Sequence, residues 1–190
     1  MRTRSKASGS AFLMAALMLM VLPLKWVIAA IIAATFHELC HYGAVRLCGG
    51  ELCGVHVGSI GAKMEVRGLS IGEELLCSLA GPAGSLLLLL LATWIPRTAI
   101  CGGFHALFNL LPVYPLDGGR ALRCVAGMLL PLKIADQLCI VVEWCCLIAL
   151  LALGSYGTFM LRLGIMPLGI ALTVALHAFR GKIPCKLGLY

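Results

Sequence analysis

The sequence lacks a C-x-x-C pair, although it contains 10 cysteines among 190 residues. This absence excludes a thiolate zinc ribbon and a thioredoxin-like redox motif, because both need two cysteines at that spacing. Most of the cysteines lie inside apolar stretches, as Cys77, Cys139, Cys145 and Cys146 do. We therefore interpret them as small buried hydrophobic residues in a reducing, cytosol-facing context.

Charged residues are also scarce: they make up 12% of the chain, whereas apolar residues make up 61%. Soluble chains contain about 45 to 50% apolar residues, so this composition indicates a membrane protein. The net charge of +7 would suit either nucleic acid or an anionic bilayer surface. The basic residues stand at the ends of apolar runs and form no stripe with aromatics. We therefore expect the lipid bilayer as a partner, and no nucleic acid.

A length of 190 residues allows one domain. We therefore predict a single membrane-embedded domain over residues 1–190 without a separate soluble regulatory domain. Its apolar runs predict about six transmembrane helices, each near the ~20 residues that cross the hydrocarbon. The predicted spans cover residues 11–24, 26–47, 74–95, 100–116, 134–153 and 156–179. The first run could instead be a signal-peptide core, but apolar sequence resumes after Lys25 without a clear cleavage site.

Six spans place both termini on one side of the membrane, and the distribution of basic residues indicates which side. If the N-terminus is cytoplasmic, only Lys25, Arg97 and Arg162 of the 15 lysines and arginines face outward. The others collect on the cytoplasmic side, as the positive-inside rule requires. We therefore predict a multi-pass protein of the cell membrane with both termini in the cytoplasm.

Residues 49–70 differ from the rest of the chain because they combine glycines and charged residues with short alternating stretches. This pattern predicts a β-hairpin or small sheet between the second and third spans. An edge of that hairpin could accept an extended substrate strand. The predicted fold class is therefore an all-α integral membrane protein with one small β element.

The stretch His37-Glu38-Leu39-Cys40-His41 matches the H-E-x-x-H pattern inside the second predicted span. Residues four apart lie on one face of a helix, so His37 and His41 can bind one cation while Glu38 acts as a general base on a bound water. Two ordinary surface histidines are the alternative interpretation. Ionisable residues are costly inside an apolar span, which favours the metal site.

A catalytic zinc site needs a third protein ligand, and Asp117 is the candidate. It lies in a segment that two prolines should keep from forming a regular helix, and two glycines after it would permit tight turns. The alternative is a loop carboxylate paired with Arg120 or Arg123. The predicted topology favours the metal site, because His41 and Asp117 would both lie near cytoplasmic helix ends.

Three ordered motifs resemble the site-2 protease family of intramembrane zinc metalloproteases: HELCH at residues 37–41, LAGPAGS at 79–85 and NLLPVYPLDGGR at 109–120. The short layout with a small sheet after the first motif is most similar to the stage IV sporulation protein FB branch. The resemblance implies one zinc ion per chain, held by His37, His41 and Asp117, with Glu38 as the catalytic residue.

The resemblance also implies residues that contact the substrate. Asn109, Pro112 and Pro115 would position the substrate strand. Ser85 stands where the family often has Asn at the end of G-P-x-x-N, so it is a candidate for a polar contact to the substrate or oxyanion.

The implied reaction is hydrolysis of a peptide bond within or next to the membrane segment of a tethered protein, with membrane regulatory proteins as possible partners. The branch resemblance adds processing of a sporulation sigma-factor precursor, in the membrane around the forespore. Two other functions remain open. A non-catalytic adaptor of the same fold would bind protein segments without cutting them. A divalent-metal transporter would need ligands in series along a path, whereas these converge on one site.

Further polar residues in apolar stretches have plainer interpretations. His105 would share a helix face with Asn109 and is either a packing residue or a neighbour of the site. His56 and His177 are expected at membrane interfaces. Asp136 should lie at a span boundary, and Glu143 should bond within the helical bundle or face a water-filled cavity.

Overall fold

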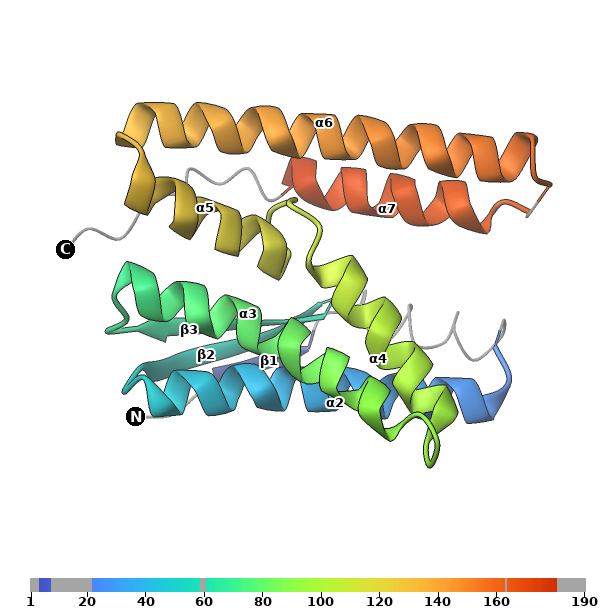
Figure 1. The fold of residues 1–190 in the computed structure, drawn as a ribbon, viewed down its shortest axis with the longest axis horizontal. Coiled ribbons are helices and arrows are strands. Elements are labelled where there is room, and N and C mark those ends of the chain that lie inside the picture. Colours follow the sequence, from blue (N-terminus) through green and yellow to red (C-terminus); the bar gives the residue numbers. More distant parts are fainter. Residues whose placement is uncertain (1–3, 8–21, 59–60, 163, 181–190) are drawn as a thin grey trace. The chain divides into compact units, whose positions relative to one another are not determined.

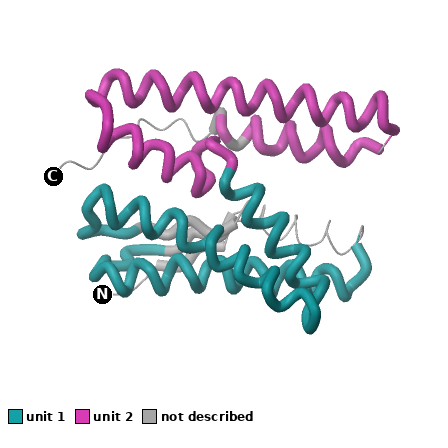
Figure 2. Tube along the Cα trace, in the orientation of Figure 1, with its two compact units in different colours: residues 1–110 teal, residues 111–190 magenta. Residues whose placement is uncertain are grey.

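The computed structural model describes residues 4–7, 22–58, 61–162 and 164–180. In these residues the protein is mostly helical, with one small sheet (Figure 1). The chain divides into two compact units, Met1–Leu110 and Leu111–Tyr190 (Figure 2). Most of the first predicted span, residues 11–24, lies outside the described residues.

Three helices pack against one another in the first unit: α2 (Leu24–Leu47), α3 (Ile71–Leu87) and α4 (Pro96–Asn109). Helix α3 continues as a 3-10 helix, η1, over Leu88–Leu91. Its start is fixed by a capping box, in which Ser70 and Glu73 each accept a hydrogen bond from the other's backbone N–H. Both α2 and α3 are long apolar helices, and α2 carries the H-E-x-x-H stretch.

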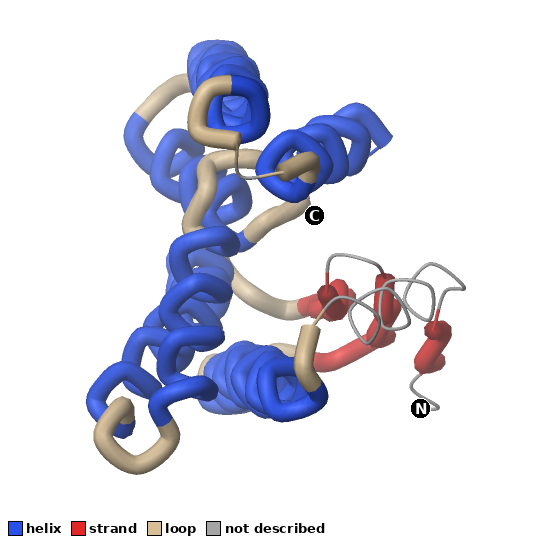
Figure 3. The backbone as a smooth tube through the Cα atoms, turned by 90° about the vertical axis from the view of Figure 1, so that its right-hand side faces the viewer, coloured by secondary structure: helices blue, strands red, loops and turns tan. Residues whose placement is uncertain are grey.

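The sheet has the strand order β1-β2-β3, with β1 at Arg4–Ala7, β2 at Glu51–Gly58 and β3 at Gly61–Arg67. Strands β2 and β3 form an antiparallel hairpin, which confirms the prediction for residues 49–70. Figure 3 shows the strands grouped to one side of the helices of this unit. Strand β1 was not predicted, because its four residues gain strand character only by parallel pairing with the distant β2.

The second unit contains α5 (Asp117–Leu129), α6 (Leu132–Phe159) and α7 (Met166–Arg180). Helix α6 packs against both of the others. Ala126, Ala135 and Cys139 form a small buried cluster between α5 and α6. Cys77 and Cys139 are buried free thiols as predicted, but Cys145 is exposed on α6. Its predicted burial was wrong because an apolar run in a membrane helix does not distinguish the packed face from the outer face.

Among the described residues, three helices are long and apolar enough to cross a membrane: Leu24–Leu47, Ile71–Leu91 and Leu132–Phe159. The spans predicted over residues 100–116 and 156–179 stay predictions, and the helices described within them are shorter than these ranges. Helix α4 has 14 residues and α7 has 15. At about 1.5 Å per residue, the described length of each is shorter than the ~30 Å of a hydrocarbon core.

The observed helix boundaries have local causes. Helix α4 ends at Asn109 because Pro112 lacks an N–H and disfavours helical geometry in the residue before it. The fifth span was predicted to end at residue 153, yet α6 continues through Gly154 to Phe159. A Cβ at Gly154 would lie 2.9 Å from the Pro167 carbonyl oxygen and 3.1 Å from the Ala171 Cβ. The glycine therefore permits close packing of α6 against the start of α7.

Candidate metal centre

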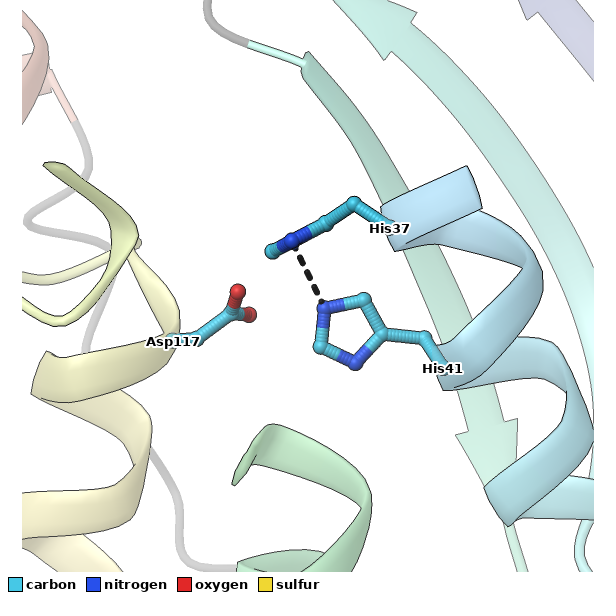
Figure 4. A group of neighbouring side chains, drawn as sticks. All are labelled: His37, His41 and Asp117. Carbon is cyan, nitrogen blue, oxygen red and sulfur yellow. Dashed lines mark hydrogen bonds between the residues drawn. The ribbon is translucent and has the colours of Figure 1, made fainter. Parts of the chain in front are cut away.

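Helix α2 brings His37 and His41 together one helical turn apart. His37 is buried, with 2% of its surface exposed, and His41 is partly buried. Their Nε2 atoms lie 3.1 Å apart, with the ring planes at 82° (Figure 4). Two nitrogens bound at about 2.0 to 2.1 Å to one tetrahedral zinc would be about 3.3 Å apart. The pair is therefore spaced as two ligands of a single ion.

Helix α3 orients both rings through their other nitrogens. The Nδ1 of His41 lies 2.7 Å from the Cys77 carbonyl oxygen, and the Nδ1 of His37 lies 2.9 Å from the Ser85 hydroxyl. A carbonyl oxygen only accepts, so His41 Nδ1 carries the proton and donates it. The Nε2 lone pair of His41 is then available to a cation. This is the arrangement in which an outer hydrogen bond fixes the tautomer of a metal-binding histidine.

Small residues on α3 make this close approach possible. A Cβ at Gly81 would run into the His41 ring, and a Cβ at Gly84 would run into the Cys40 sulfur. The small residues of the 79–85 motif thus let α3 pack directly against the histidine turn of α2. Cys40 fills the space opposite Gly84 as a small side chain.

The Ser85 hydroxyl gives a specific prediction for metal binding. Ser85 is fully buried, at 0% exposure, and Ser85→Ala would leave His37 Nδ1 without this partner. We expect Ser85→Ala to lower zinc affinity about 10-fold, as measured by competition with a chromophoric chelator.

Ser78 provides the matched control for that measurement. It is also at 0% exposure on α3, but its hydroxyl donates to the Glu74 carbonyl oxygen at 2.8 Å. Ser78→Ala should leave zinc affinity unchanged. An equal loss of zinc affinity in the two variants would contradict a specific role for the contact between Ser85 and His37. The predicted contact of Ser85 with substrate stays a prediction.

Asp117 is the first residue of α5 and is buried, with 8% of its surface exposed. The prediction of tight turns after it was wrong, because Gly118 and Gly119 belong to the first turn of the helix. A Cβ at Gly119 would lie 2.5 Å from the Val113 carbonyl carbon and 2.6 Å from the Tyr114 nitrogen. The proline-containing loop thus folds back across the first turn of α5, and only glycine leaves room for it.

His37, His41 and Asp117 form a group in the described residues that could hold a metal ion. Each offers one ligand atom, and these atoms lie within 4.8 Å of one another. Figure 4 draws the three side chains, the histidines from α2 and the aspartate from the first turn of α5. Glu38, on the same turn of α2, is half-buried. The donor set of two imidazoles and one carboxylate is typical of a zinc site that keeps its fourth position open.

Three residues predicted to contact substrate lie in the segment of chain that precedes Asp117. Asn109 is buried at the end of α4, where its Nδ2 donates to the His105 carbonyl oxygen at 3.0 Å. Pro112 and Pro115 are half-buried in the loop that follows. Their roles toward a substrate stay predictions.

Two polar residues that the sequence analysis did not assign to the metal site, His105 and Glu143, have clear contacts. The His105 ring lies edge-on to His37, with ring centroids 4.5 Å apart, which makes it a neighbour of the metal ligands. Glu143 is buried in α6 and forms an ion pair with Arg123 of the same unit at 3.9 Å. Asp136 is exposed, as expected at a helix boundary. The side chains of His56 and His177 lie outside those that the structure describes.

The comparisons with known proteins agree with this arrangement at the level of the fold. The structure resembles the solved "Site-2 Protease from Methanocaldococcus jannaschii" with a TM-score of 0.68, over 93% of this chain and 89% of that chain. The two chains share a fold. Their sequences are 19% identical. No protein-family model matches the sequence, and no curated protein matches it either.

Proposed function

We propose that this protein is an intramembrane zinc metalloprotease that hydrolyses a peptide bond within or next to the membrane segment of a tethered protein. The observation that carries the proposal is the convergence of His37 Nε2 and His41 Nε2, 3.1 Å apart, inside a helix of membrane-spanning length. The fold shared with a site-2 protease supports it.

In this proposal His37, His41 and Asp117 hold one zinc ion per chain. Bound there, zinc would supply Lewis-acid polarisation of a water and of the scissile carbonyl. The donor chemistry fits, since His41 presents an unprotonated Nε2 and the Ser85 hydroxyl can accept a hydrogen bond from His37 Nδ1. His37 and Asp117 are buried, and burial strengthens the interaction of the aspartate with a cation.

Glu38 acts as the general base. Glu38 follows His37 directly in α2, and in the proposed reaction its carboxylate takes a proton from the attacking water and passes it to the departing amine. Asn109, Pro112 and Pro115 position an extended substrate segment. The segment must be unwound, because the hydrogen bonds of a helix shield its carbonyl groups.

The substrate is proposed to be another membrane protein, because a soluble segment would have to enter an apolar site. The distribution of basic residues favours both termini in the cytoplasm, a topology in which His41 and Asp117 lie near cytoplasmic helix ends. We therefore propose that the cut lies near the cytoplasmic side of the membrane. Membrane regulatory proteins are further candidate partners. A role specific to sporulation stays a prediction from the sequence resemblance.

Reconstitution into liposomes tests the proposed function against its alternatives. The protein is embedded with a membrane-tethered reporter substrate and with a zinc-sensitive dye inside the vesicles. A protease cuts the reporter without carrying zinc across the bilayer. Zinc flux without cleavage would establish a transporter, and reporter binding without cleavage would establish an adaptor.

A further inference from the structure

Glu143 is a buried carboxylate in the longest apolar helix of the described chain. It is 9% exposed in α6, which has the highest hydropathy of the three candidate spans. An ionisable residue at such a position is costly unless it is paired, and such residues are usually functional. It forms an ion pair with Arg123 of α5, with Arg123 Nη2 3.9 Å from a Glu143 carboxylate oxygen.

Arg123 makes a second contact on its other side. Its guanidinium lies over the Tyr114 ring, 4.4 Å from the ring centroid. A cation within about 6 Å of an aromatic centroid is attracted by the ring, and a planar guanidinium can also stack on it. Arg123 thus connects α6 to the proline-containing loop, residues 111–116, that precedes Asp117.

That loop leads directly into α5, whose first residue is Asp117. The Leu116 N–H donates to the Val113 carbonyl oxygen at 2.9 Å, and the Arg120 N–H donates to the Leu116 carbonyl oxygen at 3.1 Å. Gly119 keeps the loop backbone in close contact with the first turn of α5. Holding the Tyr114 ring therefore also holds the backbone from which the Asp117 carboxylate extends.

We propose that Arg123, anchored by Glu143, is a positioning residue that fixes the Tyr114 loop and thereby the Asp117 ligand. The inference rests on the proposed function, since it gives Asp117 a metal to bind. The Arg123–Glu143 pair alone would hold α5 on α6, and the Tyr114 contact extends this restraint to the loop. Without the contact between Arg123 and Tyr114, the loop and Asp117 would sample other positions, and zinc would be held mainly by the histidines.

The positioning role of Arg123 is tested by measuring the zinc affinity of the full-length protein in detergent. Thermal unfolding of the zinc-free protein is measured in parallel. Arg123→Gln should lower the affinity about 10-fold, the low end for residues that orient a metal ligand. Tyr114→Leu should give a similar loss while leaving the Arg123–Glu143 pair intact. Because both changes break one link, the double variant should lose little more than either single variant.

The controls are taken from the same unit. Lys133→Gln and Asp136→Asn remove an exposed charge of each sign from α6 and should leave zinc affinity unchanged. If Arg123→Gln and Tyr114→Leu lower only the unfolding temperature and not the affinity, the pair is structural and the inference is overturned. Asp117→Asn separates the two proposals: if it leaves zinc affinity unchanged, the proposed metal site fails. If it weakens binding while Arg123→Gln and Tyr114→Leu do not, only the positioning role fails.

Discussion

Replacing Glu38 by Gln is expected to abolish cleavage of a tethered substrate while zinc remains bound. The amide has nearly the shape of the carboxylate but cannot accept a proton from water at neutral pH. General-base catalysis contributes about 10² to 10⁴ in rate, so product should fall by at least about 100-fold. The measurement compares product formation by the wild type and Glu38→Gln with their zinc content by elemental analysis.

The informative control is a carboxylate that lies elsewhere in the chain. Asp136→Asn neutralises an exposed acid on α6 and should cleave like the wild type. Cleavage by Glu38→Gln at the wild-type rate would show that Glu38 is not the base. Loss of zinc from this variant would instead assign Glu38 to the metal-binding set.

Asp117→Asn is expected to have the other large effect, because it removes the negative charge and an anionic ligand together. Asn keeps the size of the side chain, so the start of α5 should be preserved. A metal held by two imidazoles alone should bind at least about 100-fold more weakly, since the lost group is a ligand rather than an outer partner. Cleavage should fall in parallel at limiting zinc. Chelator competition gives the affinity, and activity is titrated against added zinc.

This prediction differs from the one for Glu38 in its response to zinc. Excess zinc should restore part of the activity of Asp117→Asn, because the base and both histidines are still present. It should restore none of the activity of Glu38→Gln. An Asp117→Asn protein with wild-type affinity would show that the third ligand is another residue.

The parts of the structure that follow local rules could be predicted from the sequence. Helix α2 begins two residues before its predicted start, and the hairpin of β2 and β3 lies within its predicted range. The first is one long apolar run, and the second combines short alternating stretches with glycines. The histidine pair follows from helix periodicity alone, because residues i and i+4 share a face whatever packs against them.

The parts that depend on contacts between distant residues could not be predicted. The hydrogen bond between His37 and Ser85 joins residues 48 positions apart. The hydrogen bond from His41 to Cys77 uses a backbone carbonyl, a group that every residue has, so no residue type indicates it. Helix α5 was missed because two glycines suggest a turn, while their actual use is close packing against the loop. The pairing of Glu143 with Arg123 joins two elements whose contact no local pattern encodes.

The central claim is that peptide-bond hydrolysis in the membrane depends on a metal held by the histidine pair. The most direct measurement removes zinc from the reconstituted protein with a chelator, records cleavage of a tethered substrate, and then adds zinc back. The same series is run on His37→Ala. We predict that the wild type loses cleavage on chelation and recovers it with one zinc per chain, and that His37→Ala recovers little at that stoichiometry. Cleavage that persists in the metal-free wild type, or that recovers equally in both proteins, would contradict the account.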